Sequence, residues 1–203
     1  MKKIIKILKR KKVITMNKGL YIVVSGPSGV GKGTICKRLI EDLKLEYSIS
    51  MTTRDIREGE IDKVNYYFTN KEDFENRIKN NEFIEYATYN DNYYGTLKKE
   101  VIDKLEMGKN IICEIEVQGA KQIRALFPDA LLIYILPPSF EELRNRLINR
   151  NTEDIDTINK RLDIANAEKE YIDIYDYVVV NDDIDVATDK IKKIITDRQK
   201  ANL

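Results

Sequence analysis

Residues 20–34 read LYIVVSGPSGVGKGT, and this stretch decides the fold of the chain. The apolar, β-branched run Leu20–Val24 predicts a buried strand, and the residues after Lys32 have the spacing of an amphipathic helix. Between them, the pattern Gly26-x-x-x-x-Gly31-Lys32 predicts a loop that binds phosphate through inward N–H groups, a helix N-terminus and a lysine. An ordinary strand–turn–helix is the alternative, but strand, loop, lysine and helix in register favour the phosphate site. The predicted phosphate-binding residues are Gly26, Pro27, Ser28, Gly29, Val30, Gly31, Lys32, Gly33 and Thr34.

The end of this loop departs from its commonest form. The residue after the lysine, usually a Ser or Thr that binds magnesium, is Gly33, and a hydroxyl follows one position later at Thr34. This GKGT ending resembles some nucleoside monophosphate kinases, in which phosphate oxygens and water hold magnesium more than the loop hydroxyl does. The variant favours a small-molecule kinase over a GTPase switch or a motor.

The composition is that of one globular domain of 203 residues, long enough for a substantial core and a small inserted subdomain. Charged residues make up 34%, and the net charge of +1 argues against a general nucleic-acid-binding protein. The chain has no histidine, which excludes Ser-His-Asp and Cys-His catalysis and His-ligated zinc. Cys36 and Cys113 lie in apolar patterns, so we expect buried thiols in a cytoplasmic protein.

Positive charge is concentrated at the N-terminus, where residues 1–15 contain lysines and an arginine but no acid. With the interleaved Ile and Leu residues, they could form a short basic amphipathic helix at a membrane or acidic surface. They are too short and interrupted for a signal peptide or a membrane span. The preferred interpretation is a basic extension, residues 1–17, ahead of a domain at 18–203, and we then expect no stable membrane association.

Apolar strands alternate with helices along most of the chain, which predicts an α/β fold with a parallel sheet covered on both faces. Segment 51–97 breaks the alternation and is predicted to be an insertion at one edge of the sheet. The expected strands are 20–25, 47–50, 111–116, 131–136 and 177–180, and the expected helices are 31–44, 98–107, 118–126, 139–149, 154–171 and 184–200.

Two arginines, Arg54 and Arg57, lie three residues apart in the polar loop after the second expected strand. Guanidinium groups match phosphate oxygens, so this pair could clamp one phosphate. The alternative is a solvated loop in which neighbouring acids neutralise the arginines. Tyr66 and Tyr94 lie in aromatic-rich stretches that suit a nucleotide, although such residues more often belong to a core.

Glu114 and Glu116 end the expected strand 111–116 and, being two residues apart, are expected on one face of it. The carboxyl end of a parallel strand lies on the loop side of the sheet, near the phosphate loop. Glu114 then occupies the position of an acid that holds magnesium through water. A pair of solvated acids is an equally good interpretation of these residues alone.

The motifs taken together are far more specific than the phosphate loop alone. They resemble the guanylate kinase family, in the family's order, over about residues 18–197. The matching stretches are GPSGVGKGT (26–34), SMTTRDIREGE (50–60), NEFIEYATYNDNYYGT (81–96), CEIEVQGA (113–120), ILPPS (135–139) and VVVNDD (178–183). The resemblance implies a P-loop NTPase fold with a mixed α/β insertion at about 50–97 that binds GMP and a helical lid at about 139–162. It also implies the reaction ATP + GMP → ADP + GDP, with magnesium, in purine nucleotide metabolism.

The resemblance implies roles for individual residues. The GMP phosphate would be gripped by Arg54, Arg57, Tyr66 and Tyr94, and guanine would be surrounded by Ser50, Glu85, Thr96 and Glu116. The lid would supply Arg146, Arg150 and Arg161, for which a solvated arginine face is the alternative. The catalytic residues would be Lys32, Arg54, Arg150 and Arg161. Magnesium would be held mainly by phosphates and water, with Thr34 and Glu114 as the nearest side chains.

Guanine suits a site with two carboxylates, because its N1–H and N2–H₂ groups donate to ionised acids. Adenine lacks this donor pair and would leave a buried acid unpaired. The chain differs from some family members in having Thr96 for serine, and Glu114 and Glu116 for aspartates. Neither difference changes the expected activity.

Two other classes of protein stay open. Another nucleoside monophosphate kinase would share the phosphate loop but would not need Glu85 and Glu116 around a guanine. Guanylate-kinase-like domains of scaffold proteins bind phosphorylated peptides, yet they tend to have degraded phosphate loops, whereas Lys32 and its glycines are intact here. The sequence leaves the choice between a monomer and a homo-oligomer open.

Overall fold

The computed structural model describes residues 19–89, 91–149 and 154–201, and the predicted extension at 1–17 and Arg150 lie outside these ranges. A central five-stranded sheet has the order β2-β7-β1-β8-β9, and all its neighbouring strands are parallel. Its strands are β1 (Tyr21–Ser25), β2 (Glu46–Tyr47), β7 (Ile111–Glu114), β8 (Leu131–Leu136) and β9 (Tyr177–Val180).

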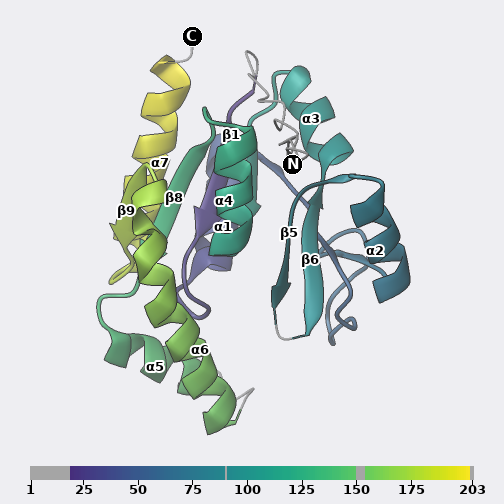
Figure 1. Cartoon of the computed structure of the whole chain (residues 1–203). Helices are drawn as coiled ribbons and strands as arrows, with labels where there is room; N and C mark the ends of the chain where they lie inside the picture. The colour runs from purple at the N-terminus through teal and green to yellow at the C-terminus, as the bar shows by residue number, and fades with distance from the viewer. Residues whose placement is uncertain (1–18, 90, 150–153, 202–203) are drawn as a thin grey trace, which may run out of the picture.

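Helices cover both faces of the central sheet (Figure 1). Ile22 and Val24 of β1 pack in one core cluster with α1 and α7, whereas Tyr21 and Val23 pack in another with α3 and α4. Because both faces of β1 are buried, its sequence is apolar almost throughout instead of alternating. The predicted α/β fold is therefore confirmed. These helices are α1 (Lys32–Leu43), α3 (Lys98–Glu106), α4 (Val117–Leu126) and α7 (Ile184–Ala201).

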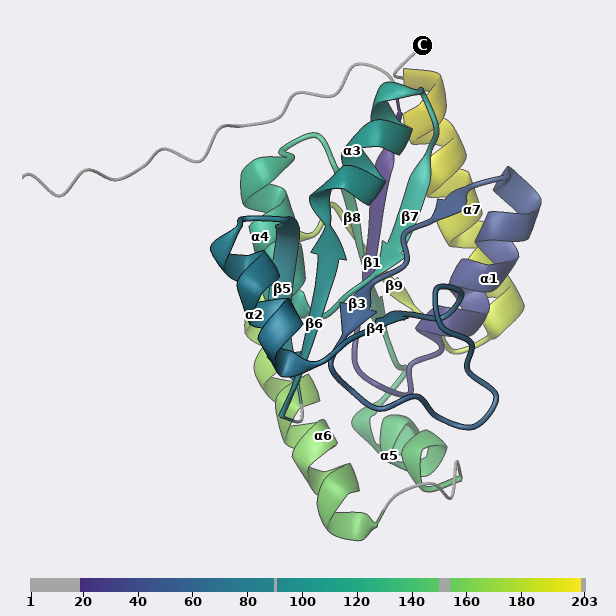
Figure 2. The same ribbon diagram turned by 90° about the vertical axis from the view of Figure 1, so that its right-hand side faces the viewer.

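The predicted insertion forms a second sheet, the inserted sheet, in the order β4-β3-β6-β5 (Figure 2). β6 pairs antiparallel with β5 and β3, and β3 pairs parallel with β4. Phe74 of α2 is fully buried, with its ring centroid 4.4 Å from that of Phe83 and 5.2 Å from that of Tyr93. This aromatic stack gives the inserted sheet a core of its own. The elements are β3 (Met51–Thr52), β4 (Tyr67–Phe68), α2 (Lys71–Lys79), β5 (Phe83–Tyr89) and β6 (Asn92–Leu97).

The chain crosses between the two sheets where one strand, 47–50, is expected. That prediction was wrong, because β2 belongs to the central sheet and β3 to the inserted sheet. The Ser48 N–H donates to the Ile112 carbonyl of the central sheet, while the Ser50 carbonyl accepts from the Tyr67 N–H of the inserted sheet. Three residues, 48–50, are thus enough for the change of partner.

The return from the inserted sheet has no loop. Leu97 is the last residue of β6 and also the N-cap of α3. The inserted sheet is therefore joined to the central sheet by two short connections, residues 48–50 and Leu97.

The expected strand 111–116 was also too long. β7 ends at Glu114, because its pairing with β1 stops where that strand leads into the phosphate loop. Glu116 is instead the N-cap of α4. The two glutamates therefore do not share one face of a strand.

Two helices, α5 (Phe140–Asn149) and α6 (Ile155–Glu168), lie below the central sheet in the region of the predicted lid (Figure 1). Leu143, Leu147 and Ile158 form a small core between them. The predicted helix 154–171 is shorter than expected, because after α6 the chain winds more tightly into a 3₁₀ helix, η1 (Lys169–Ile174), that packs on the core. In the described ranges, no helix is both long and apolar enough to cross a membrane.

Candidate active site

The phosphate loop, residues 26–31, joins β1 to α1 at the carboxyl end of the central sheet. Gly26 and Gly31 have φ angles of 149° and 99°, which L side chains rarely adopt. A Cβ at Gly26 would lie 2.4 Å from the Ile135 carbonyl oxygen, and one at Gly31 would lie 2.6 Å from the Asn181 side-chain nitrogen. The glycines therefore let the loop backbone lie directly against β8 and Asn181.

Lys32 is the first residue of α1 and is only 8% exposed. Its ammonium donates to the Gly26 carbonyl at 2.6 Å and to the Pro27 carbonyl at 3.3 Å. Gly31, the N-cap of α1, has no side chain to accept from the first turn. The backbone N–H groups at this helix end and the neighbouring ammonium together form a site for an anion.

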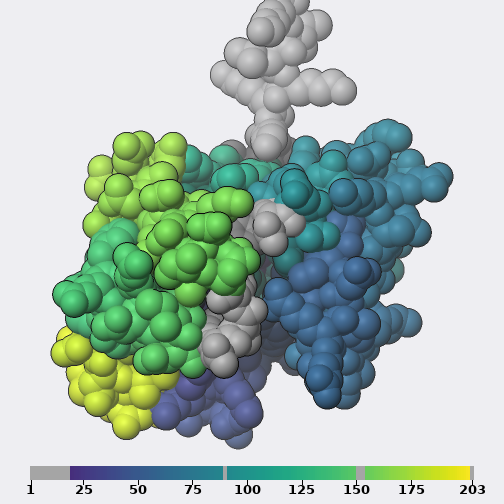
Figure 3. All heavy atoms as spheres, turned by 90° about the horizontal axis from the view of Figure 1, so that it is seen from below, coloured from purple at the N-terminus to yellow at the C-terminus, as the bar shows by residue number. Residues whose placement is uncertain are grey.

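A cleft of about 290 Å³ extends from the phosphate loop to the inserted sheet. Seen from below, the α5–α6 segment (green) and the inserted segment (blue) lie on opposite sides of the molecule (Figure 3). The predicted site residues that line the cleft are Ser28, Gly29, Gly31, Lys32, Gly33, Ser50, Arg54, Arg57, Tyr66, Glu85, Tyr94, Glu114, Glu116 and Arg161. The predicted residues that are not part of its lining are Gly26, Pro27, Val30, Thr34, Thr96 and Arg146.

Arg54 is fixed in the wall of this cleft by an acid and two aromatic rings. Its Nη1 and Nη2 donate to the two carboxylate oxygens of Glu60, at 2.9 and 2.8 Å. Its guanidinium carbon lies 5.4 Å from the ring centroid of Tyr66 and 5.6 Å from that of Phe68. These hydrogen bonds from the Arg54 guanidinium hold the pKa of Glu60 below its usual value. Arg54 is thus an oriented cation in the cleft wall.

Glu85 is a buried acid of β5, with an exposed fraction of 4%. The Thr96 hydroxyl on β6 donates to its Oε1 at 2.7 Å, so Thr96 reaches the cleft through Glu85. Burial raises the pKa of the Glu85 carboxyl to about 7, the Thr96 hydrogen bonds oppose this rise, and the Glu116 charge adds to it. The Oε2 of Glu85 would lie 2.3 Å from a Cβ at Gly119, so only a glycine in the first turn of α4 leaves room for it. Glu85 is therefore a desolvated acceptor for N–H donors.

Glu114 and Thr34 lie at the helix end of the phosphate loop. Glu114 is the last residue of β7, and its Oε2 would lie 3.6 Å from a Cβ at Gly33. Thr34 is exposed in the first turn of α1. A carboxylate and a hydroxyl are hard oxygen donors of the kind that magnesium prefers. Glu114, which lines the cleft, therefore fits the predicted ion, whereas Thr34 offers a suitable hydroxyl from outside the cleft lining.

The predicted lid arginines differ in position. Arg161 of α6 lines the cleft and donates from Nη1 to the Ser28 hydroxyl of the phosphate loop. Arg146 of α5 instead pairs with Glu142 at 2.8 Å and donates to the Asn181 carbonyl at 3.1 Å. Arg150, between the two helices, lies outside the described residues.

Three residues without a predicted role support the site. Glu60 orients Arg54, Gly119 makes room for Glu85, and Asn181 holds the phosphate loop through a hydrogen bond of 2.7 Å. The sequence alone could have indicated Gly119, because a glycine destabilises the interior of a helix and its presence there often reflects a packing or functional role. Glu60 is one of the neighbouring acids that the sequence offers as partners of the two arginines, whereas the role of Asn181 depends on a tertiary contact.

Known proteins resemble the chain over most of its length. The family model described as guanylate kinase matches residues 18–198. A guanylate kinase of Clostridium tetani (strain Massachusetts / E88) is 50% identical over 181 residues, which are 89% of this chain and 87% of that protein. The crystal structure of guanylate kinase from Anaplasma phagocytophilum has a TM-score of 0.76 and 34% identity, over 90% of this chain and 87% of that chain. An uncharacterized protein from Eubacterium ventriosum, 18% identical with a TM-score of 0.52 over 89% and 99% of the two chains, shares the fold.

Proposed function

Since the chain belongs to the guanylate kinase family, we propose that its cleft holds ATP and GMP side by side for phosphoryl transfer. The chain is an ATP:GMP phosphotransferase, and its products are ADP and GDP. One observation carries the assignment of the cleft to this reaction: the cleft that Lys32 and the phosphate loop line is also lined by Glu85 and Glu116. A phosphate site is suited to ATP, the phosphoryl donor, and two carboxyl groups are suited to the N–H groups of guanine.

The donor subsite is the phosphate loop with the start of α1, residues 26–34. Its N–H groups bind the ATP phosphates, and Lys32 exchanges the Gly26 and Pro27 carbonyls for β- and γ-phosphate oxygens. Magnesium, when bound with ATP, neutralises part of the phosphate charge. Thr34 and Glu114 would hold it, mainly through water.

The acceptor subsite is the wall formed by the inserted sheet and the start of α4. Four residues grip the GMP phosphate, namely Arg54, Arg57, Tyr66 and Tyr94. Four others surround guanine, namely Ser50, Glu85, Thr96 and Glu116. Glu85 must be ionised to accept from the N1–H and N2–H₂ groups, and these donors replace the water that its burial has removed. An adenine in the same place would leave the acid without a donor.

The transfer step needs positioning and charge stabilisation more than proton transfer. The attacking oxygen belongs to the GMP phosphate, which is already anionic, so no general base is required in a chain without histidine. Lys32 and Arg54 hold the two phosphates in line. As the lid closes and excludes water, Arg161 leaves Ser28 for the transferring group, and Arg150 joins it.

We also assign the reaction to residues 18–203 and to the cytoplasm. The small net charge argues against a nucleic-acid partner, and the lack of disulfide patterning supports a cytoplasmic enzyme, for which we expect no stable membrane association.

The test is a coupled assay of ADP release with ATP and magnesium, with GMP, AMP, UMP and TMP as acceptors. We expect strong turnover with GMP alone, and loss of turnover when EDTA removes the metal. Turnover with another nucleotide in place of GMP would reject the assignment of the acid pair. A folded protein inactive with every acceptor would reject the enzyme and favour a phosphopeptide-binding module.

A further inference from the structure

A second polar cluster lies beside the cleft, between α6 and the start of α4. Ser28, Glu116 and Arg161 line both the cleft and a small cavity of about 10 Å³, and Glu168 lines the small cavity only. Arg161 and Glu168 are seven residues apart in one helix, so they lie on the same face of it. One face of α6 therefore touches the phosphate loop at one end and the acid of the base subsite at the other.

Glu168 has partners on two other elements. The Tyr134 hydroxyl on β8 donates to its Oε2 at 3.3 Å, and the Glu116 carboxyl lies within hydrogen-bonding reach. Two carboxyl groups in contact are stable together only if they share a proton. Burial, with the charge of Glu116 second, raises the pKa of Glu168 to about 7, against the opposing effect of Lys32. Because the Tyr134 hydroxyl donates to one oxygen of Glu168, a proton on its other oxygen is available to Glu116, which lines the same small cavity.

We propose that Glu168 is a positioning residue for guanine recognition, which donates a hydrogen bond to the Glu116 carboxylate and links the base subsite to the helix that carries Arg161. The proposal rests on the proposed function, in which Glu116 accepts from guanine. Glu116 is the N-cap of α4 but makes no side-chain capping bond, so its carboxylate needs another partner to fix its direction. A proton from Glu168 fixes one oxygen and leaves lone pairs for the base.

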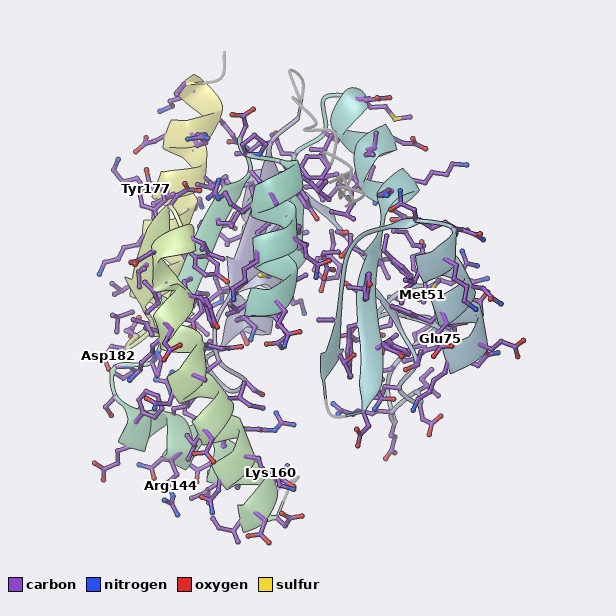
Figure 4. The ribbon with its side chains drawn as sticks, viewed as in Figure 1. Met51, Glu75, Arg144, Lys160, Tyr177 and Asp182 are labelled. Atoms are coloured by element: carbon purple, nitrogen blue, oxygen red, sulfur yellow. The ribbon has the colours of Figure 1, made fainter. Side chains whose placement is uncertain are left out.

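The same contact couples the base to the lid. Lys160, labelled in Figure 4, lies on the lower part of α6 and marks the turn that carries Arg161. Because α6 is one continuous helix from Ile155 to Glu168, a shift of its upper end also moves Arg161.

The experiment measures the Kd of GMP, and separately that of ATP with magnesium, by calorimetry on the full chain. Loss of a charge-assisted hydrogen bond corresponds to about a tenfold loss of affinity, so E168A should raise the Kd of GMP about tenfold. The Kd of ATP should stay within about twofold, as expected for a site without this contact. E168Q keeps a donor and should stay within about threefold of wild type for GMP. E170A, an exposed acid in η1, is the matched control.

A double-mutant cycle separates this proposal from the proposed function. If Glu168 acts through Glu116, E168A should have no further effect on GMP affinity in an E116A background. Wild-type affinity in E168A, equal defects in E168A and E168Q, or additive effects of E168A and E116A would each overturn the positioning role. Wild-type GMP affinity in E116A would instead reject the guanine assignment of Glu116 itself. If E168A does not fold, E168M fills the same volume without a donor and carries the same expectation.

Discussion

Glu60 accepts from both terminal nitrogens of Arg54, at 2.8 and 2.9 Å, and the two side chains are only 19% and 12% exposed. Tyr66 and Phe68 lie against the same guanidinium, so three contacts fix one long side chain. An arginine that is already ordered loses little rotamer freedom when a phosphate arrives. In the proposed phosphate clamp, the pair would therefore contribute to recognition through the orientation of Arg54.

Replacing Glu60 tests this orientation. Glu60→Gln keeps the size of the side chain but loses the two-pronged ion pair, so we expect about a tenfold rise in the KM for GMP, with the KM for ATP unchanged. Steady-state kinetics with each substrate varied in turn measures both. Glu58→Gln, in the exposed part of the same loop, is the control. Tighter binding of GMP in Glu60→Gln would mean that Glu60 mainly neutralises Arg54.

Gly119→Ala tests whether the contact of residue 119 with Glu85 outweighs the preference of a helix for alanine over glycine. Alanine in place of glycine within a helix normally stabilises it by up to about 1 kcal/mol. Here the new Cβ would lie 2.3 Å from Glu85 Oε2 and must displace the carboxylate. We expect the KM for GMP to rise about tenfold or more, as for loss of one charged hydrogen-bond partner. Gln118→Ala, exposed in the same turn, should leave the KM unchanged, and a normal KM in Gly119→Ala would show that Glu85 can move without effect.

Ionisation of Glu85 should favour GMP binding as the pH rises around neutrality. Glu85 has a pKa of about 7 in the unliganded protein, well above that of an exposed glutamate, and it must lose its proton before it accepts from guanine. About a tenth of Glu85 is ionised at pH 6 and about nine tenths at pH 8, which alone would lower the Kd about tenfold. Glu168 loses its proton over the same range and then no longer donates to Glu116, so its titration opposes this fall.

Glu85→Gln isolates this effect from the titration of the GMP phosphate. The variant should lose most of the pH dependence that Glu85 contributes, and it should discriminate less between GMP and AMP. Calorimetric titrations of wild type and variant at several pH values provide the comparison. Identical pH profiles in the two proteins would contradict the role of Glu85.

Lys32→Ala should separate turnover from acceptor binding. In the proposed site the ammonium serves the ATP phosphates, so kcat should fall by about 100-fold or more, as when a preorganised donor to transition-state charge is removed. GMP is proposed to bind on the other wall, so its Kd should stay within about threefold. Lys37→Ala, exposed on α1, is the control. A parallel loss of GMP affinity would mean that the two subsites are not separate.

Long, buried elements are the part of the fold that can be predicted from sequence. The bounds of β8 agree with the expected 131–136, because a continuous, buried apolar run between turns leaves few alternatives. The bounds of β9 agree with the expected 177–180 as well, although only Val179 of this edge strand is buried. The prediction of a single strand at 47–50 was wrong for the opposite reason. Two-residue strands have no periodicity, and their assignment to different sheets depends on distant partners such as Ile112 and Tyr67.

The candidate site likewise has features that the local sequence predicts and features that depend on contacts between distant segments. Arg54 and Arg57 leave two interpretations open, a phosphate clamp and a neutralised loop. In the structure Arg54 has both properties, since it pairs with Glu60 while it lines the cleft. The place of Glu168 depends on η1, on β8 and on the N-cap of α4 at once, and no local pattern encodes that combination.

The two covalent connections of the inserted sheet, residues 48–50 and Leu97, are not its only attachments. The sheet is also held along β5, where Ile84 belongs to the core of the central sheet and the Gln122 side-chain amide donates to the Tyr86 carbonyl at 2.7 Å. A hinge motion of the inserted sheet would therefore break contacts along β5 as well as bend the two connections. The strand that carries Glu85 is thus held against α4, and a nucleotide meets a wall that is already assembled.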